Sequence, residues 1–348
     1  MSADVQSGQS LMLRETREAP AAVARLLAAN VEACRELGRR LRKNPPAFAV
    51  SSARGSSDTA ATFAKYLMEI RLGIVTASVG PSVSSVYAAT PNMQGALFFT
   101  VSQSGRSPDI LRLAEVARAG GAITVAFVND AGSPLAEICE IVLPLNAWPE
   151  RSVAATKSVI ASLAAVLQFA AYWADDRKLL DALERLPGDL ESAAALDWGA
   201  ATPLLTGAKS LFVTGRGIGL ALAQEAALKL KETCGIHGEA LSAAELMHGP
   251  MTLAGPDFPV FVLSQPDETL PSVAHLVTML TQRGVPVVAA GPAAQGSTLT
   301  LPSDSSLSPF TMPIALLQSF YPLAEQVDRA RGRDPDAPPH LKKVTKTL

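Results

Sequence analysis

The 348-residue sequence predicts an α/β protein of two similar halves, each a doubly wound, mostly parallel sheet flanked by helices. Short apolar runs alternate with segments of helical period. The runs lack polar alternation, which indicates strands covered on both faces, as in a parallel sheet. The segments SSARGSS and FVTGRGI each place an Arg-Gly pair, Arg54-Gly55 and Arg216-Gly217, between a strand and a helix. This repeated pattern predicts a duplicated α/β unit.

Each element follows from its local pattern. An amphipathic helix is expected at 11–43, with a break at Pro20 and a cationic end, ELGRRLRK, that suits a helix C-terminus. In the first half, strands are expected at 47–53, 73–79, 96–102, 123–130 and 141–145, and helices at 57–70, 82–90 and 108–120. A helical middle covers 152–197, and the second half has strands at 210–215, 258–264 and 286–291 and helices at 221–234, 270–284 and 313–331. The tail from Gly332 is polar, rich in proline and without helical period.

These elements divide the chain into four expected parts. They are an N-terminal helical segment at 1–44, a first α/β domain at 45–197, a second at 198–331 and a C-terminal tail or lid at 332–348.

Composition argues against several classes of protein. The chain is 48% hydrophobic and 18% charged with a net charge of −2, which predicts a globular protein and argues against nucleic-acid binding. Its three cysteines form no CxxC, so neither a disulfide framework nor a thiolate zinc site is indicated, and a cytoplasmic location fits. The N-terminus lacks the order of a secretory signal. The uncharged run 159–174 is too short for a membrane span, and is expected to be a helix buried in a core or at a subunit interface.

Hydroxyl-rich loops follow two predicted strands. One loop contains Ser102, Gln103, Ser104 and Ser107, and the other contains Arg54, Ser56 and Ser57. Ligands of parallel sheets bind beyond the carboxyl ends of strands, where helix N-termini and hydroxyl donors suit a dianionic phosphate. Simple N-capping is the alternative that these residue types leave open. There is no P-loop, and Gly215 to Gly219 lacks the dinucleotide spacing, which favours a small ligand with one phosphate.

Charged residues gather in the second half, in KLKETCGIHGEALSAAELMHGP. Lys229 and Glu232 lie three residues apart on one predicted helix, hence on one face. Spacing alone favours a surface ion pair. The HxE at His237 and the single ExxH at Glu245 are weak metal patterns without the further ligands that such sites need. His248 lies at a predicted turn, from which it can be presented to a neighbouring site.

Together these segments resemble the sugar isomerase (SIS) family, in particular the isomerase part of glucosamine-6-phosphate synthase. The segment ARGSSDTAATFAKYL is most similar to the stand-alone glucosamine-6-phosphate deaminases of that family. SQSG with Ser107 resembles the phosphate loop SQSGET, and RSVAATKS resembles VASTK. ALKLKE…HGEA…AELMHGP is similar to KLKE…HAEA…GELKHGP, and the tail DPDAPPHLKKVTK resembles DxDxPRNLAKSVT. The resemblance runs from about residue 45 to Lys346 and implies two tandem SIS domains.

The resemblance implies a role for each matched residue. The phosphate of a sugar 6-phosphate would be held by Ser57, Ser102, Gln103, Ser104 and Ser107, and the sugar pocket would be lined by Ser56, Val153 and Thr156. Glu232 would move a proton between C1 and C2, and Lys229 would contact the open-chain sugar. His248 would open the ring across the interface of a homodimer, and Lys343 would meet the carbonyl under a closing tail. No metal, organic cofactor, nucleic acid or membrane is implied.

The expected activity is deaminating isomerisation of glucosamine 6-phosphate to fructose 6-phosphate and ammonia. Residue 2 is serine, and only about 45 residues precede the first strand, so no glutaminase domain is expected. Ala155, in place of the family's serine, and Arg106, in place of its glutamate, leave galactosamine 6-phosphate or a fructosamine phosphate open as substrates. A non-catalytic sugar-phosphate sensor is a further alternative, which the retained Glu232 disfavours.

Overall fold

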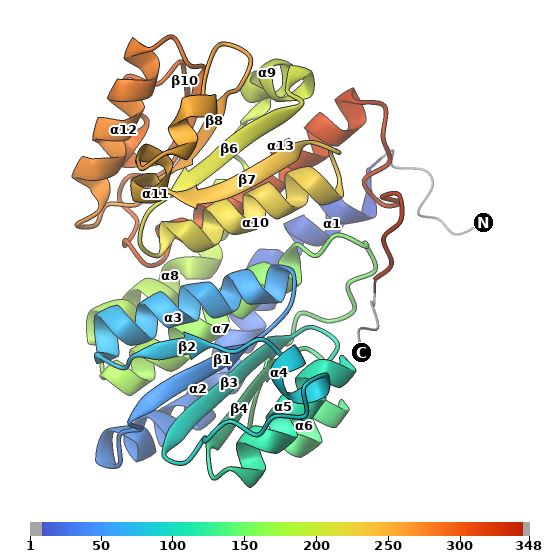
Figure 1. Cartoon of the computed structure of the whole chain (residues 1–348), viewed down its shortest axis with the longest axis vertical. Coiled ribbons are helices and arrows are strands. Elements are labelled where there is room, and N and C mark those ends of the chain that lie inside the picture. The colour runs from blue at the N-terminus through green and yellow to red at the C-terminus, as the bar shows by residue number, and fades with distance from the viewer. Residues whose placement is uncertain (1–8, 344–348) are drawn as a thin grey trace.

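The chain folds into two α/β units that meet through a shared layer of helices (Figure 1). The structure is a computed structural model that describes residues 9–343. The predicted N-terminal segment and tail extend beyond this range, so residues 1–8 and 344–348 lie outside the described residues.

The first unit begins with two helices and contains the first sheet. Its elements are α1 (Leu11–Arg17), α2 (Ala19–Lys43), β1 (Phe48–Ser52), α3 (Ser56–Leu72), β2 (Thr76–Ser78), α4 (Ser82–Ser85), β3 (Ala96–Ser102), α5 (Pro108–Ala119), β4 (Ile123–Val128), α6 (Pro134–Ile138), β5 (Ile141–Pro144), α7 (Lys157–Ala174) and α8 (Arg177–Ala194).

The second unit contains the second sheet and ends with a long helix. Its elements are α9 (Thr202–Gly207), β6 (Ser210–Gly215), α10 (Gly219–Glu232), β7 (His237–Ser242), α11 (Ala243–Met247), β8 (Val260–Leu263), α12 (Leu270–Gln282), β9 (Val287–Ala290), β10 (Leu299–Leu301) and α13 (Met312–Ala330).

Both sheets have the same topology. The strand orders are β2-β1-β3-β4-β5 and β10-β9-β8-β6-β7, and every pair is parallel. Counted within each half, both orders are 2-1-3-4-5, which is the doubly wound order that reverses between its first and third strands. The duplicated, mostly parallel α/β architecture predicted from the sequence is confirmed.

The largest hydrophobic core lies between the two sheets. It joins one face of the first sheet, at Phe99 and Phe127, to one face of the second, at Phe261, through buried residues of the intervening helices. Two smaller cores cover the outer faces, under α5 and α6 on one side and under α11 and α12 on the other. The shared core fixes the two halves against each other, so side chains from both can form one site.

Helix α7 lies in this shared core. It is long and apolar enough to cross a membrane. However, 89% of its 18 residues are buried inside the structure, as in the core helix of a globular protein. The expectation of a buried helix is confirmed. The helix is covered by α2 and α3 of the same chain, so its apolar surface does not call for a second subunit.

Edge strands account for most differences from the predicted elements. Strand β7 was not expected, because it lies at a sheet edge and its segment HGEALS has no apolar run. Strand β2, at the other sheet's edge, covers only Thr76–Ser78 of the predicted 73–79, since Gly73 ends α3 with a φ of 67°. The predicted helix at 82–90 stops at Ser85. The break in the N-terminal helix falls at Glu18, just before Pro20.

Candidate active site

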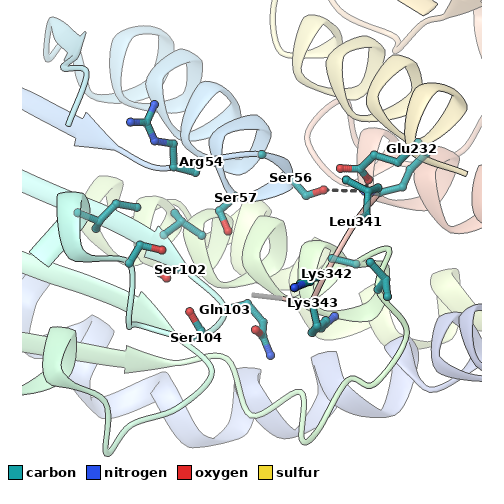
Figure 2. Close-up of a pocket in the computed structure, with 17 residues that line it drawn as sticks. Arg54, Ser56, Ser57, Ser102, Gln103, Ser104, Glu232, Leu341, Lys342 and Lys343 are labelled. Carbon is teal, nitrogen blue, oxygen red and sulfur yellow. Dashed lines mark hydrogen bonds and ion pairs between the residues drawn. The ribbon is translucent and has the colours of Figure 1, made fainter. Parts of the chain in front are cut away.

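A cavity of about 350 Å³ opens at the carboxyl ends of β1 and β3 (Figure 2). These are the strands between which the order of the first sheet reverses, the position where doubly wound sheets bind ligands. The cavity is lined by Arg54, Gly55, Ser56, Ser57, Val101, Ser102, Gln103, Ser104, Ser107, Ile110, Val153, Ala155, Lys229, Glu232, Leu341, Lys342 and Lys343. It therefore brings together loops of the first half, helix α10 of the second half and the tail.

Two polar loops form the first wall. Ser57 belongs to the start of α3, while Ser102, Gln103, Ser104 and Ser107 connect β3 to α5. Ser107, which precedes α5, makes no side-chain cap bond within the described chain, and the residue before α3 is a glycine. Simple N-capping therefore does not account for Ser57 or Ser107. Ser57, Gln103 and Ser107 line the cavity, and their side chains have no hydrogen-bond partner among residues 9–343, so they are available to bind an anion.

The conformation of the second loop depends on Gly105. Its φ is 62°, and a Cβ there would lie 2.1 Å from Ser133 Oγ. The Gly105 N–H donates a 3.0 Å hydrogen bond to Ser102 Oγ. A residue with a side chain would be strained in φ and would also clash. The glycine thus sets the loop geometry on which the serine hydroxyls depend.

Arg54 and Asp109 tie the two loops together. Arg54 donates hydrogen bonds of 3.1 Å and 2.7 Å from Nε and Nη2 to one oxygen of Asp109. The Asp109 side chain is fully buried, whereas that of Arg54 is half-exposed at the cavity wall. A buried carboxylate next to an anion site would be unfavourable without a cation. The pair therefore neutralises a charge close to the expected phosphate.

The opposite wall is an ion-pair cluster on α10. Lys229 Nζ lies 2.5 Å from Glu232 Oε2 and 3.5 Å from Glu225 Oε1, and it donates a 2.9 Å hydrogen bond to Ser56 Oγ. The side chains of Lys229 and Glu225 are buried, while that of Glu232 is 25% exposed and lines the cavity. Burial would lower the pKa of Lys229, but the two carboxylates outweigh burial and the pKa lies above its ordinary value. The pair is thus not a surface ion pair.

Glu225 and Tyr321 form the buried side of this cluster. Burial raises the pKa of Glu225, while Lys229 and hydrogen bonds to Ser56 and Tyr321 lower it in part. The Tyr321 hydroxyl donates a 3.1 Å hydrogen bond to Glu225 Oε1. Burial, and then Glu225, raise the pKa of Tyr321 well above its ordinary value, so the phenol stays protonated. Sequence reasoning missed Glu225, although its position four residues before Lys229 on one helix was a usable signal.

Lys343 reaches the site from the tail. Its Nζ donates a 2.8 Å hydrogen bond to Glu150 Oε2, and the Glu150 side chain is fully buried. Glu150 also accepts hydrogen bonds from the N–H groups of Thr156 and Ser158 at the start of α7 and from the Ser158 hydroxyl. Burial would raise the pKa of Glu150, but Lys343 and these hydrogen bonds outweigh it and hold the pKa below its ordinary value. Sequence reasoning missed Glu150.

The cavity gathers ten of the twelve residues expected to form the site. The gathered residues are Ser56, Ser57, Ser102, Gln103, Ser104, Ser107, Val153, Lys229, Glu232 and Lys343. The two others, Thr156 and His248, do not line it within the described chain. Thr156 is fully buried at the start of α7, and His248 is exposed at the end of α11. Within residues 9–343, no group of three or more His, Cys, Asp or Glu side chains could hold a metal ion.

Known proteins share this fold and much of this sequence. The profile of the SIS domain family matches residues 49–172 and 204–303, more than half of the chain. The chain is 34% identical over 313 residues to glutamine–fructose-6-phosphate aminotransferase (isomerizing) of Aeropyrum pernix, covering 83% of this chain and 49% of the relative. The chain thus spans about half the length of the curated relatives it matches.

Two solved structures extend the comparison. A candidate phosphosugar isomerase from Silicibacter pomeroyi DSS-3 matches with a TM-score of 0.89 and 40% identity, over 94% of this chain and 100% of that chain. The C-terminal domain of glucosamine-fructose-6-phosphate aminotransferase from Francisella tularensis matches with a TM-score of 0.85 and 24% identity, over 97% and 99% of the two chains. At that identity the second match bears on the fold alone.

Proposed function

The chain belongs to the SIS domain family and contains two tandem SIS domains, and on this premise we propose that it converts glucosamine 6-phosphate and water to fructose 6-phosphate and ammonia. The observation that supports the proposal is the Lys229–Glu232 ion pair, because both residues line the same cavity as the serine loops. A cavity of about 350 Å³ suits a ligand the size of a hexose phosphate.

The serine loops are proposed to hold the phosphate. Ser57, Gln103 and Ser107 offer donors that have no partner among the described residues, and the helix N-termini behind them favour an anion. This subsite would fix one end of the open-chain sugar and leave C1 and C2 close to Glu232. Binding energy from the phosphate would then position the reacting carbons.

Glu232 is proposed to be the base. In the open-chain aldehyde, Glu232 would take the C2 proton and return it to C1, while the Lys229 ammonium stabilises the developing charge on O1 and supplies a proton there. The product is a C2 imine with a C1 alcohol. Water adds to this imine and ammonia leaves, so the overall reaction consumes one water and no redox partner.

Two further residues would complete the reaction. Lys343, delivered by the tail onto Glu150, would place an ammonium near the substrate oxygens. His248 lies outside the cavity and would open the ring in a neighbouring copy of a homodimer. Both roles come from the family resemblance, and the homodimer is part of the proposal.

Ala155 supports a second candidate. It lines the cavity with a methyl group, so it offers no hydroxyl with which to recognise a sugar hydroxyl. A site that does not hydrogen-bond a particular hydroxyl discriminates weakly between epimers. Galactosamine 6-phosphate or a fructosamine phosphate is therefore the second candidate substrate.

Ammonia and fructose 6-phosphate release from glucosamine 6-phosphate tests the proposal, with Glu232→Gln and the exposed Glu239→Gln compared in parallel. We expect equal amounts of both products from the wild type and from Glu239→Gln, and at least a thousandfold slower release from Glu232→Gln. Ammonia from galactosamine 6-phosphate alone would establish the second candidate. Tight sugar-phosphate binding without release of ammonia from any hexosamine phosphate would overturn the deaminase proposal and favour a sensor.

A further inference from the structure

Helix α1 contacts both the tail and the loop that carries Glu150. It has seven residues and lies against α13 in the second half. The Gln318 amide donates a 2.9 Å hydrogen bond to the Thr16 carbonyl, and the Ser10 hydroxyl donates one of 2.9 Å to Glu325. These contacts fix α1 on α13, at the side of the cavity where the tail arrives.

The tail is attached to α1 through Asp336. One Asp336 oxygen accepts a 2.6 Å hydrogen bond from the Leu11 N–H, and the other accepts a 2.9 Å bond from the Met12 N–H. Upstream, Arg333 donates a 2.6 Å hydrogen bond to the carbonyl of Thr233, the residue after Glu232. Downstream, the chain reaches Lys343 on Glu150. Asp336 is thus the middle anchor of the tail.

The Glu150 loop is attached to α1 through Glu15. The Glu15 carboxylate accepts hydrogen bonds of 2.5 Å and 3.0 Å from the N–H groups of Arg151 and Ser152. These residues lie between Glu150 and Val153, which lines the cavity. Glu15 is 3% exposed, so its hydrogen bonds to the loop are shielded from water. The N-terminal end of α1 therefore holds the tail, and Glu15, further along the helix, holds the loop that carries the acceptor of the tail lysine.

We propose that α1 positions Lys343 against Glu150, with Asp336 and Glu15 as the positioning residues. A helix of seven residues is too short to be stable alone, so its first turn and Glu15 belong to one cooperative unit. Loosening the Asp336 end would loosen the Glu15 end, and the reverse. The importance of this contact for catalysis rests on the proposed function, whereas the coupling between the two segments does not.

Hydrogen–deuterium exchange of the full chain tests the coupling without any substrate. Asp336→Asn and Glu15→Gln keep the side-chain shapes but each turns one acceptor into a donor that faces a backbone N–H. We expect each variant to speed exchange roughly tenfold in both the 333–343 and the 150–158 segments. Glu191→Gln, an exposed acid on α8, is the control and should change neither segment. Faster exchange only in the segment next to each substitution, or in neither, would overturn the proposal.

Kinetics add a second measurement if the wild type deaminates glucosamine 6-phosphate. Asp336→Asn should lower kcat roughly tenfold and change KM less than threefold, because the phosphate loops are untouched while Lys343 is misplaced. An unchanged kcat would remove the catalytic role of the contact. A wild type without activity on any sugar phosphate would count against the proposed function, and the exchange result would still decide the coupling.

Discussion

The Lys229 ammonium in the second half donates a 2.9 Å hydrogen bond to the Ser56 hydroxyl in the first half. Ser56 in turn lies 3.3 Å from Glu225 Oε1, so its hydroxyl joins the start of α3 to the ion-pair cluster of α10. This bond helps to hold the Lys229–Glu232 pair in place on the wall opposite the serine loops. Ser56 thus supplies one of the hydrogen bonds between α3 and this cluster, alongside the Thr59 hydroxyl, which lies 3.4 Å from Glu225 Oε2.

Replacing Ser56 with alanine should therefore reduce turnover. Hydrogen bonds to charged groups contribute enough to predict a fall in kcat of about 10–100-fold. Steady-state ammonia release measures this, with the neighbouring Ser57→Ala as the comparison, because Ser57 makes no contact with Lys229 among the described residues. If Ser56→Ala retained full kcat, the hydroxyl would not hold the cluster in place.

Ser57 and Ser107 should act on binding instead. If their hydroxyls hold the phosphate, Ser57→Ala and Ser107→Ala should each raise KM about 5–20-fold and leave kcat nearly unchanged. Exposed Ser305→Ala provides the matched control. A matching rise in Kd for inorganic phosphate, measured by calorimetry, would identify the phosphate as the affected group. A change confined to kcat would contradict this assignment.

The predictions from sequence succeeded where both faces of a strand are covered. Strands β3 and β6 begin and end where their apolar runs do, at Ala96–Ser102 and Ser210–Gly215. Burial on both faces produces an uninterrupted apolar run, and such a run can be read without knowledge of the partner strands. Edge strand β7 has no such run, since its segment is partly exposed, and only its pairing with β6 defines it.

Candidate-site residues could be predicted where the local sequence carried the signal. The serine loops follow strands directly, and Lys229 and Glu232 share a helix turn. Glu150 gave no local signal, because its partner Lys343 lies 193 residues away. Asp109 was missed for the same reason, as Arg54 lies 55 residues upstream. Long-range ion pairs become visible only when the sheet topology has been built.

Removing the Tyr321 hydroxyl should shift the pH dependence of turnover. Tyr321 donates a hydrogen bond to buried Glu225, whose pKa is already raised, chiefly by burial. Tyr321→Phe removes a hydrogen bond that stabilises the carboxylate and should raise that pKa further. As the pH falls, Glu225 would then become protonated at a higher pH than in the wild type, and the neutral side chain would hold Lys229 less firmly. The acidic limb of the kcat–pH profile should therefore move upward by about 1 pH unit.

Tyr87→Phe is the control for this shift, as Tyr87 is 78% exposed. Both profiles should keep the same basic limb. An acidic limb that stays in place in Tyr321→Phe would show that ionisation of Glu225 does not limit turnover.

Asp328 should make folding stability depend on pH between about 4 and 6. Its side chain is fully buried, and neither carboxylate oxygen accepts a hydrogen bond in the described chain, although Arg333 lies 3.5 Å away. Burial raises its pKa to about 6, above the roughly 4 of an unfolded chain. In this window the folded state binds more protons than the unfolded state, so this group's contribution to the free energy of unfolding falls as pH rises.

Asp328→Asn removes this titration, so the variant should become more stable relative to the wild type as the pH increases. The difference in free energy of unfolding, variant minus wild type, should grow by roughly 2 kcal/mol from pH 4 to pH 7. Urea unfolding at pH 4, 5, 6 and 7 measures it, with exposed Asp257→Asn as the control for loss of a surface charge. A constant offset across the series would mean that Asp328 ionises alike in both states, and Arg333 would then compensate its burial in full.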